Sequence, residues 1–202
     1  MSLMAWAGKD FVMPTARPAK TYVAHDAHPN ESVIIGVDPY DTDEKAKIFS
    51  VRYKDLGFLP VFVVVTNDSD QPISLNGMNA QLVTSDRSKI SAADEQDIYR
   101  RMSRPSAKTS NYPLPFPTGK VKGGVKKEAQ EEIHNARFGA RAVEPHSTQA
   151  GFLFFDVSGI SHPLDGAQFY VTGVVDAKGS ELMYFEVPLD KYTNGSSAPA
   201  NP

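Results

Sequence analysis

The apolar positions of the chain are densest at residues 58–66, where every residue from Val61 to Val65 is apolar. β-Branched and aromatic side chains of this kind fit a pleated sheet. A strand without polar positions is typical of one covered on both faces or lying in the core of a sandwich. Residues 67–70 (Asn-Asp-Ser-Asp) then form a turn, and residues 71–75 begin a return strand. The pattern predicts a hairpin at the centre of a β-sandwich.

Other short apolar or alternating stretches predict further strands along the chain. Gly36 lies within one of them and indicates a bulge. The last third has the clearest β pattern, including a Gly-containing hairpin loop at residues 176–180. The predicted strands are residues 21–24, 32–38, 49–53, 78–84, 89–90, 148–157, 167–175 and 181–189.

Three stretches have helical features, and we expect two or three short helices. The first is residues 42–48, where Asp41 and Glu44 have capping-box spacing. The second is residues 92–102, which Ser91 is expected to cap, with an Asp97–Arg101 pair on the solvent side. Ile98 and Met102 form its apolar stripe. In the third, residues 125–140, the apolar positions recur at helical spacing and the charged residues, including Glu132, are assigned to the opposite face.

Residues 104–124 contain four prolines and three glycines. This composition favours extended or polyproline conformations and forms no core. The favoured interpretation is a mobile insertion. The alternative is a segment that docks on a partner or on the protein's own sheet, because long loops in compact domains are often functional. Its apolar side chains Tyr112, Leu114 and Phe116 are the candidate partner-binding residues.

The domain prediction follows from these patterns. Residues 1–20 read as an N-terminal arm that Trp6 and Phe11 can anchor, and residues 193–202 as a disordered tail. Residues 21–192 form a single β-sandwich domain with a helical and Pro-rich insertion at about 92–140. No charged-plus-apolar signal segment follows Met1, so if the protein is exported we expect its signal to have been removed.

Composition narrows the function classes. The chain has 202 residues and a formal net charge of −3, which gives no electrostatic case for nucleic-acid binding. The absence of cysteine excludes disulfides, thiolate metal sites and a cysteine nucleophile. No apolar run approaches the roughly 20 residues of a transmembrane helix.

Candidate metal ligands occur in two places. His25, Asp26 and His28 offer imidazole and carboxylate ligands. They stand beside Pro29, however, and a solvated turn is the favoured interpretation. A second, acidic set has carboxylates suited to calcium, but it lacks EF-hand spacing, and helix capping explains it better. That set is Asp38, Asp41, Asp43 and Glu44.

Catalytic motifs are absent from the sequence. It contains no nucleophile elbow, zinc-protease helix, phosphate loop or dinucleotide fingerprint. Ser147 beside His146 does not indicate a triad, because triads are assembled in space. Gly123 and Gly124 near lysines give only a weak phosphate-binding signal. We therefore expect no enzyme and no cofactor.

Two segments carry a family resemblance. Residues 63–75 (VVVTNDSDQPISL) and 144–157 (EPHSTQAGFLFFDV) are similar to the hairpin and the C-terminal aromatic strand of immunoglobulin-like sandwich domains in exported bacterial proteins and lipoproteins, of telokin-like or antigen type. The resemblance covers residues 32–90 and 143–190. This chain differs from the family pattern in His146, in Ser158 and in the insertion. The resemblance implies export to the periplasm or cell surface and a binding or scaffold role without catalytic residues.

Three functions are consistent with the sequence. The leading one is a non-enzymatic module that binds a protein partner in the cell envelope. The alternative is a calcium- or carbohydrate-binding sandwich. The third is a hydrolase whose site the sequence does not reveal. The sequence leaves open the partner's identity and the oligomeric state. The aromatics that motivate the alternative are Tyr112, Phe116, Tyr184 and Tyr192.

Overall fold

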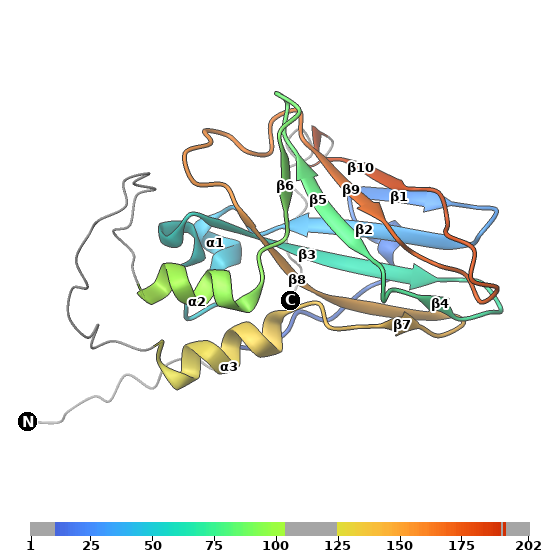
Figure 1. The fold of residues 1–202 in the computed structure, drawn as a ribbon, viewed down its shortest axis with the longest axis horizontal. Helices are drawn as coiled ribbons and strands as arrows, with labels where there is room; N and C mark the ends of the chain where they lie inside the picture. Colours follow the sequence, from blue (N-terminus) through green and yellow to red (C-terminus); the bar gives the residue numbers. More distant parts are fainter. Residues whose placement is uncertain (1–10, 104–124, 191, 193–202) are drawn as a thin grey trace, which may run out of the picture.

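The computed structural model describes residues 11–103, 125–190 and 192 of the chain (Figure 1). These residues form a mainly β structure with three antiparallel sheets, which confirms the expected fold class at that level. The first sheet contains, in spatial order, β1 (Ala24–His28), β2 (Val33–Pro39), β3 (Phe58–Asn67) and β8 (Ser147–Asp156). The second contains β10 (Phe185–Pro188), β9 (Gln168–Thr172), β5 (Asn79–Val83) and β6 (Lys89–Ser91). The third pairs β4 (Ile73–Ser74) with β7 (Ala142–Val143).

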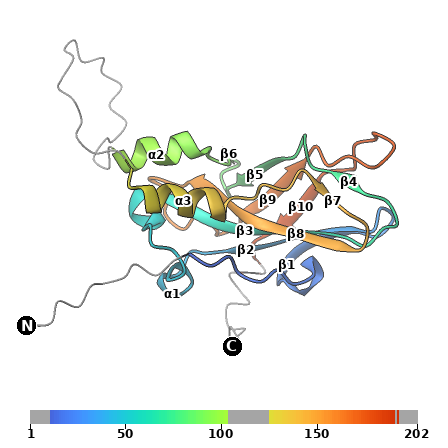
Figure 2. The ribbon, with the colours of Figure 1, turned by 90° about the horizontal axis from the view of Figure 1, so that it is seen from below.

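The described helices are α1 (Asp43–Ala46), α2 (Glu95–Ser103) and α3 (Lys127–Ala136). Two 3₁₀ turns, η1 (Ala19–Thr21) and η2 (Tyr53–Leu56), precede β1 and β3. Helices α2 and α3 lie side by side at one end of the sheets (Figures 1 and 2). Ile98 of α2 and Ile133 of α3 are both fully buried, so the apolar stripes expected from the sequence do face the core.

The centre of the fold is β3, in which all ten positions are buried. Val61, Val63 and Val65 point into a core cluster shared with the second sheet. Phe62 and Val64 point the other way, into a second cluster shared with α2, α3 and the chain before β1. Successive side chains of a strand point to opposite faces, so β3 is covered on both, as its sequence predicts.

The predicted central hairpin is wrong. β3 pairs with β2 and β8, whereas Ile73 pairs with Val143 in the small third sheet. The buried amide of Asn67 explains the change of direction. Its nitrogen donates to the carbonyl oxygens of Gln71 (2.7 Å) and Val143 (3.1 Å), which directs the chain away from β3 and towards β7.

The two large sheets are joined along both sides. On one side, the Asp26 carboxylate of β1 accepts a hydrogen bond from the backbone N–H of Glu186 in β10 (2.9 Å). On the other, the chain after β6 bridges to β8, where the N–H of Ala93 donates to the carbonyl of Phe154 (2.8 Å). Unpaired strand edges are templates for pairing with other chains, and these contacts occupy them in part.

Gly36 marks a close approach and not a bulge, because the pairing of β2 with β1 and β3 is continuous through it. A Cβ atom at Gly36 would lie 2.6 Å from the carbonyl oxygen of Ala19. Ala19 is held there by its N–H, which donates to Thr66 Oγ1 (2.8 Å). Phe11 stacks on Phe49 with ring centroids 5.5 Å apart, so this residue does anchor the chain before β1, as expected.

Local errors in the expected elements have local causes. Residues 49–53 form no strand, although the alternating Phe49, Val51 and Tyr53 are all buried. This segment leads into η2, which begins at Tyr53. Of the predicted strand 21–24, only Ala24 is in a strand, because η1 ends at Thr21 and β1 begins at Ala24. His25 to His28, expected as a turn, form β1.

The helix starts also differ from the prediction. Thr42, and not Asp41, caps α1, because Thr42 Oγ1 accepts a hydrogen bond from the N–H of Lys45 (3.3 Å). Ser91 belongs to β6, and the first turn of α2 is closed by Asp94 Oδ1, which accepts from the N–H of Asp97 (2.7 Å). A short polar side chain that accepts from a free helical N–H is favoured at either position.

Candidate functional site

The predicted partner-binding residues Tyr112, Leu114 and Phe116 lie outside the described residues. Gly123 and Gly124, the candidate phosphate-binding glycines, also lie outside the described residues. The candidate sites among the described residues lie in the sheets, in α2 and α3, and in the loops that join them.

The His25–His28 segment is part of a strand and its side chains have structural partners. His25 Nδ1 is bonded to the carbonyl oxygen of Tyr22 (2.7 Å). His28 stacks on Phe185, with ring centroids 3.8 Å apart. His25 and His28 leave opposite faces of β1, because they are three residues apart on a strand. In the described part of the chain, no three His, Asp or Glu side chains gather closely enough to hold a metal ion.

The acidic segment after β2 is organised by Lys45 and Tyr192. Lys45 Nζ forms an ion pair with Asp38, and the Tyr192 hydroxyl donates to Asp41 Oδ1 (2.7 Å). Lys45 Nζ also lies 4.7 Å from the centre of the Tyr192 ring. Burial, reinforced by the bond to Asp41, raises the pKa of Tyr192 above its usual range. These contacts fasten the chain after β10 to the α1 region.

Asp97 and Arg101, expected to pair on α2, have other partners. Arg100 pairs with Asp97 (2.9 Å), and Arg101 pairs with Asp156 at the end of β8. The guanidinium of Arg101 therefore joins α2 to the first sheet instead of stabilising the helix alone.

Ser147 and His146 do not assemble into a catalytic pair. His146 Nε2 bonds to Asp70 Oδ1 (3.0 Å), and Ser147 Oγ donates to the carbonyl oxygen of Glu144 (2.8 Å). A nucleophilic serine would have to share its proton with the imidazole, and here each group has a different partner.

Glu132 is a buried acidic residue whose position was predicted wrongly from the sequence. Assigned to the solvent face of its helix, it is instead 4% exposed inside the second core cluster. Its carboxylate accepts hydrogen bonds from the N–H groups of Ser50 (2.6 Å) and Val51 (3.1 Å), from the Ser50 hydroxyl, and from the Tyr53 hydroxyl (3.2 Å). All of these partners hold α3 in place, so the role of Glu132 is structural.

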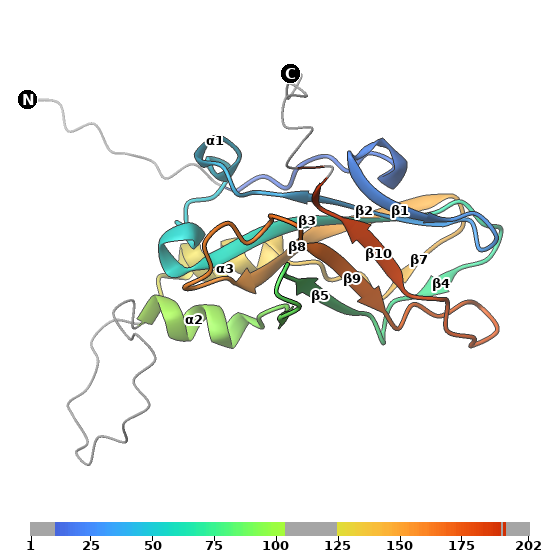
Figure 3. The same ribbon diagram turned by 90° about the horizontal axis from the view of Figure 1, so that it is seen from above.

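The outer face of the second sheet carries half-buried and exposed side chains in the described part of the chain. Phe169 and Val171 of β9 and Leu82 of β5 point into the core. The residues that alternate with them along each strand therefore point outwards. No described helix lies over β10, β9 and β5 on this side (Figure 3). The outward side chains of one row, one from each strand, follow in register: Glu186, Tyr170, Gln81 and Ser91.

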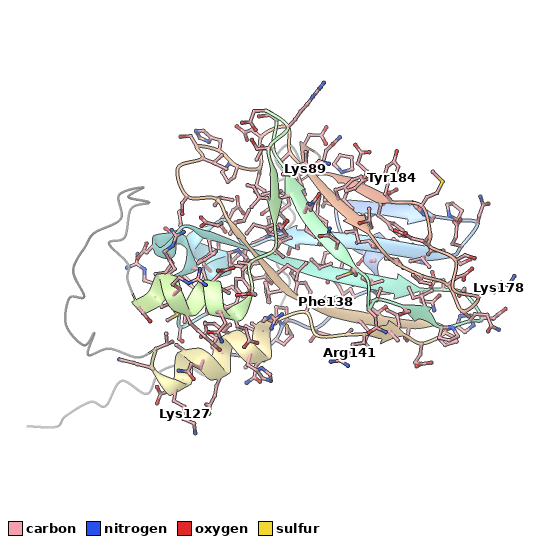
Figure 4. The ribbon with its side chains drawn as sticks, viewed as in Figure 1. Lys89, Lys127, Phe138, Arg141, Lys178 and Tyr184 are labelled. Atoms are coloured by element: carbon pink, nitrogen blue, oxygen red, sulfur yellow. The ribbon has the colours of Figure 1, made fainter. Side chains whose placement is uncertain are left out.

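Two tyrosines form the aromatic part of this face. The rings of Tyr170 and Tyr184 lie 5.0 Å apart at an angle of 31°. Tyr184 is 46% exposed and its neighbour Met183 is 69% exposed, which makes them two of the most exposed large apolar residues described. Figure 4 shows Tyr184 and Lys89 on the same side of the molecule, away from α3 and Lys127. We call this surface the tyrosine face: Tyr170, Tyr184, Met183 and the outward residues of β5, β6, β9 and β10.

No protein-family model matches the chain, and no curated protein is similar to it at a significant level. Among the described helices, none has the length and apolar content needed to cross a membrane. Function must therefore be argued from the surfaces themselves.

Proposed function

We propose that the protein is a non-enzymatic binding module that holds a protein partner on its tyrosine face. The observation that carries the proposal is the group of exposed Tyr184 and Met183 and half-buried Tyr170 on a sheet face that no described helix covers. Tyrosine and methionine are enriched at protein interfaces, where they bury large areas at low entropic cost.

The rest of the structure supports the choice of this face. The first sheet has both sides in the core, one against the second sheet and one against α2, α3 and the chain before β1. Among the outward residues of the second sheet, the charges are few, with Glu186 and Lys89 at opposite edges. Depletion of charge at the centre and polar groups at the rim is the usual anatomy of an interface.

Export to the cell envelope and an immunoglobulin-like identity are part of the same proposal. The layered antiparallel sheets, the open face and the resemblance of residues 63–75 and 144–157 support them. The sheet order departs from the immunoglobulin pattern: β1, β2 and β3 are consecutive in one sheet, whereas the third immunoglobulin strand belongs to the opposite sheet.

A pull-down from an envelope extract of the source organism tests the proposal. The bait is the whole chain, compared with the variant Tyr170→Ser/Tyr184→Ser. The matched control is Val23→Ser, which removes an exposed apolar side chain (48% exposed) just before β1, outside the strands of the second sheet. We expect a specific protein that the double variant loses and the control retains. Equal retention by all three baits would remove the tyrosine face as the site.

A second candidate function, glycan binding, is favoured by one further observation. Three amide side chains, Asn79, Gln81 and Gln168, point outwards around Tyr170. Amides can bond to adjacent sugar hydroxyls while an aromatic ring covers the apolar side of the sugar. Screening the whole chain and the variant Gln81→Ala against immobilised glycans separates the two functions. A glycan that the whole chain retains and Gln81→Ala retains more weakly, with no retained protein, favours glycan binding.

A further inference from the structure

A cavity of about 490 Å³ lies where α2 faces the first sheet. Phe58, the first residue of β3, and Asp156, the last of β8, stand opposite each other in its wall. Helix α2 supplies Asp97, Arg100 and Arg101, and residues 91–93 close the remaining side. Figures 1 and 3 show α2 beside the η2 turn that leads into β3. Of these residues only Ser91, the outward residue of β6, also belongs to the tyrosine face.

Arg101 is held in a fixed position within this cavity. Its Nη1 donates to the carbonyl oxygen of Leu56 (3.3 Å) and to Ser158 Oγ (2.9 Å), and its Nη2 donates to Asp156. The guanidinium carbon lies 5.6 Å from the centre of the Phe58 ring. A guanidinium has five N–H donors. In the part of the chain that the structure describes, Nε–H and one N–H of Nη2 have no hydrogen-bond partner.

The rim of the cavity carries a second pair of opposite charges. Arg100 Nη1 lies 2.9 Å from Asp97 Oδ1, and these side chains are 73% and 46% exposed. The cavity lining therefore has two guanidinium groups and two carboxylates, so its formal net charge is zero. Because each arginine is paired with a carboxylate, neither a simple anion nor a simple cation gains a net attraction from the lining. A small molecule that carries both charges satisfies both sets.

We infer that this cavity binds a small zwitterion of the free amino acid or short peptide class. Its carboxylate takes the unused donors of Arg101, with Arg100 closing over it, and its ammonium lies at Asp97 and Asp156. The Phe58 ring offers an apolar surface to the ligand's carbon atoms. A bidentate guanidinium–carboxylate contact on a pre-positioned arginine gives orientation as well as affinity. This inference goes beyond the proposed function and does not depend on it.

The test is an NMR titration of the whole, ¹⁵N-labelled protein with the free proteinogenic amino acids and diglycine. We expect saturable amide shifts confined to residues 91–101, the start of β3 and the end of β8. At least one probe should bind with a Kd below about 10 mM. The N-acetylated and C-amidated forms of the best probe should each bind about tenfold more weakly, because each lacks one charge.

Two double variants make the result specific. Asp97→Asn/Arg100→Gln removes the rim pair without changing net charge and should weaken binding about tenfold. Lys127→Gln/Glu131→Gln removes an exposed pair on α3 in the same way and should bind as the wild type. Thermal melting checks that both variants are folded. The inference is overturned if no probe gives saturable shifts, if the singly charged forms bind equally well, or if the control weakens binding as much.

Discussion

The Glu132 carboxylate lies 3.2 Å from the hydroxyl of Tyr53, inside the core between α3 and the first sheet. Ser50 and Val51 direct their N–H groups at the same carboxylate. A buried carboxylate is costly unless its oxygens are satisfied, and here the segment before η2 supplies the donors. The irregular path of residues 49–53 is thus shaped around one acidic side chain of α3.

Replacing Glu132 by glutamine should destabilise the protein by roughly 2–4 kcal/mol, because the new NH₂ group would face donors that then lose their acceptor. Urea denaturation measures the loss. The matched control is Glu131→Gln on the solvent side of the same helix, where a change of under about 0.5 kcal/mol is expected. Equal effects of the two substitutions would show that the buried carboxylate contributes nothing special.

Alkaline pH should destabilise the protein through Tyr53. Burial, and then the nearby Glu132 charge, raise the pKa of Tyr53 far above its usual 10.0, and the pKa of Tyr40 is also raised. The folded state thus holds these protons more tightly than the unfolded state. The resulting stability is complete below about pH 10 and is lost as the pH rises above that value. Urea midpoints measured between about pH 8 and 11 should fall accordingly.

The assignment to Tyr53 is checked with two phenylalanine variants. Tyr53→Phe should be less stable at neutral pH by about 1 kcal/mol, since one hydrogen bond is lost, but its alkaline decline should be shallower. Tyr184→Phe, at an exposed tyrosine, should keep the wild-type decline. An unchanged slope in Tyr53→Phe would assign the pH dependence to other groups.

Gly36 should not tolerate a side chain. The added Cβ of Gly36→Ala would lie 2.6 Å from the backbone oxygen of Ala19, so the chain before β1 would have to shift. We expect a loss of about 1–3 kcal/mol in the free energy of unfolding. Gly139→Ala is the control, because the nearest atom there is 4.0 Å away. Equal thermal stability of the two variants would contradict the close approach.

Asp26 should protect the edge of β10. Asp26→Ala leaves the N–H of Glu186 without its carboxylate acceptor, at a cost of about 1–3 kcal/mol. Hydrogen exchange at the Glu186 amide should become faster by more than exchange at Val171 in the neighbouring β9. Asp26→Asn keeps an acceptor oxygen, so its exchange rate at the Glu186 amide should fall between those of the wild type and Asp26→Ala. Uniformly faster exchange in the whole second sheet would indicate general destabilisation instead.

The residues that were predicted correctly are those whose role is visible in their own segment. The apolar run of β3, the aromatic β8 and the β9–β10 hairpin follow from local composition, and all three elements form close to the expected residues. The β3 hairpin was mispredicted because the neighbour of β3 was sought nearby. Its real neighbours are β2, which precedes it, and β8, which begins only at Ser147.

The candidate site was harder to predict for the same physical reason. Tyr184 was noted as a possible exposed aromatic, but its contact with Tyr170 depends on the pairing of β9 with β10. Glu132 was placed on the wet side because glutamates in a helical pattern usually are. The donors that make its burial possible lie about 80 residues earlier, at Ser50 and Tyr53.

The long ladder between β3 and β8 has a consequence for how the chain folds. It joins Phe58 to Asp156 and Asn67 to Ser147, contacts that span nearly half the sequence. Contacts so distant along the chain slow folding, because a large loop must close before they form. Until β8 arrives, the most apolar segment of the protein has an open edge and is prone to misassociate with other chains. A newly made chain is therefore at greatest risk of aggregation before its last third is complete.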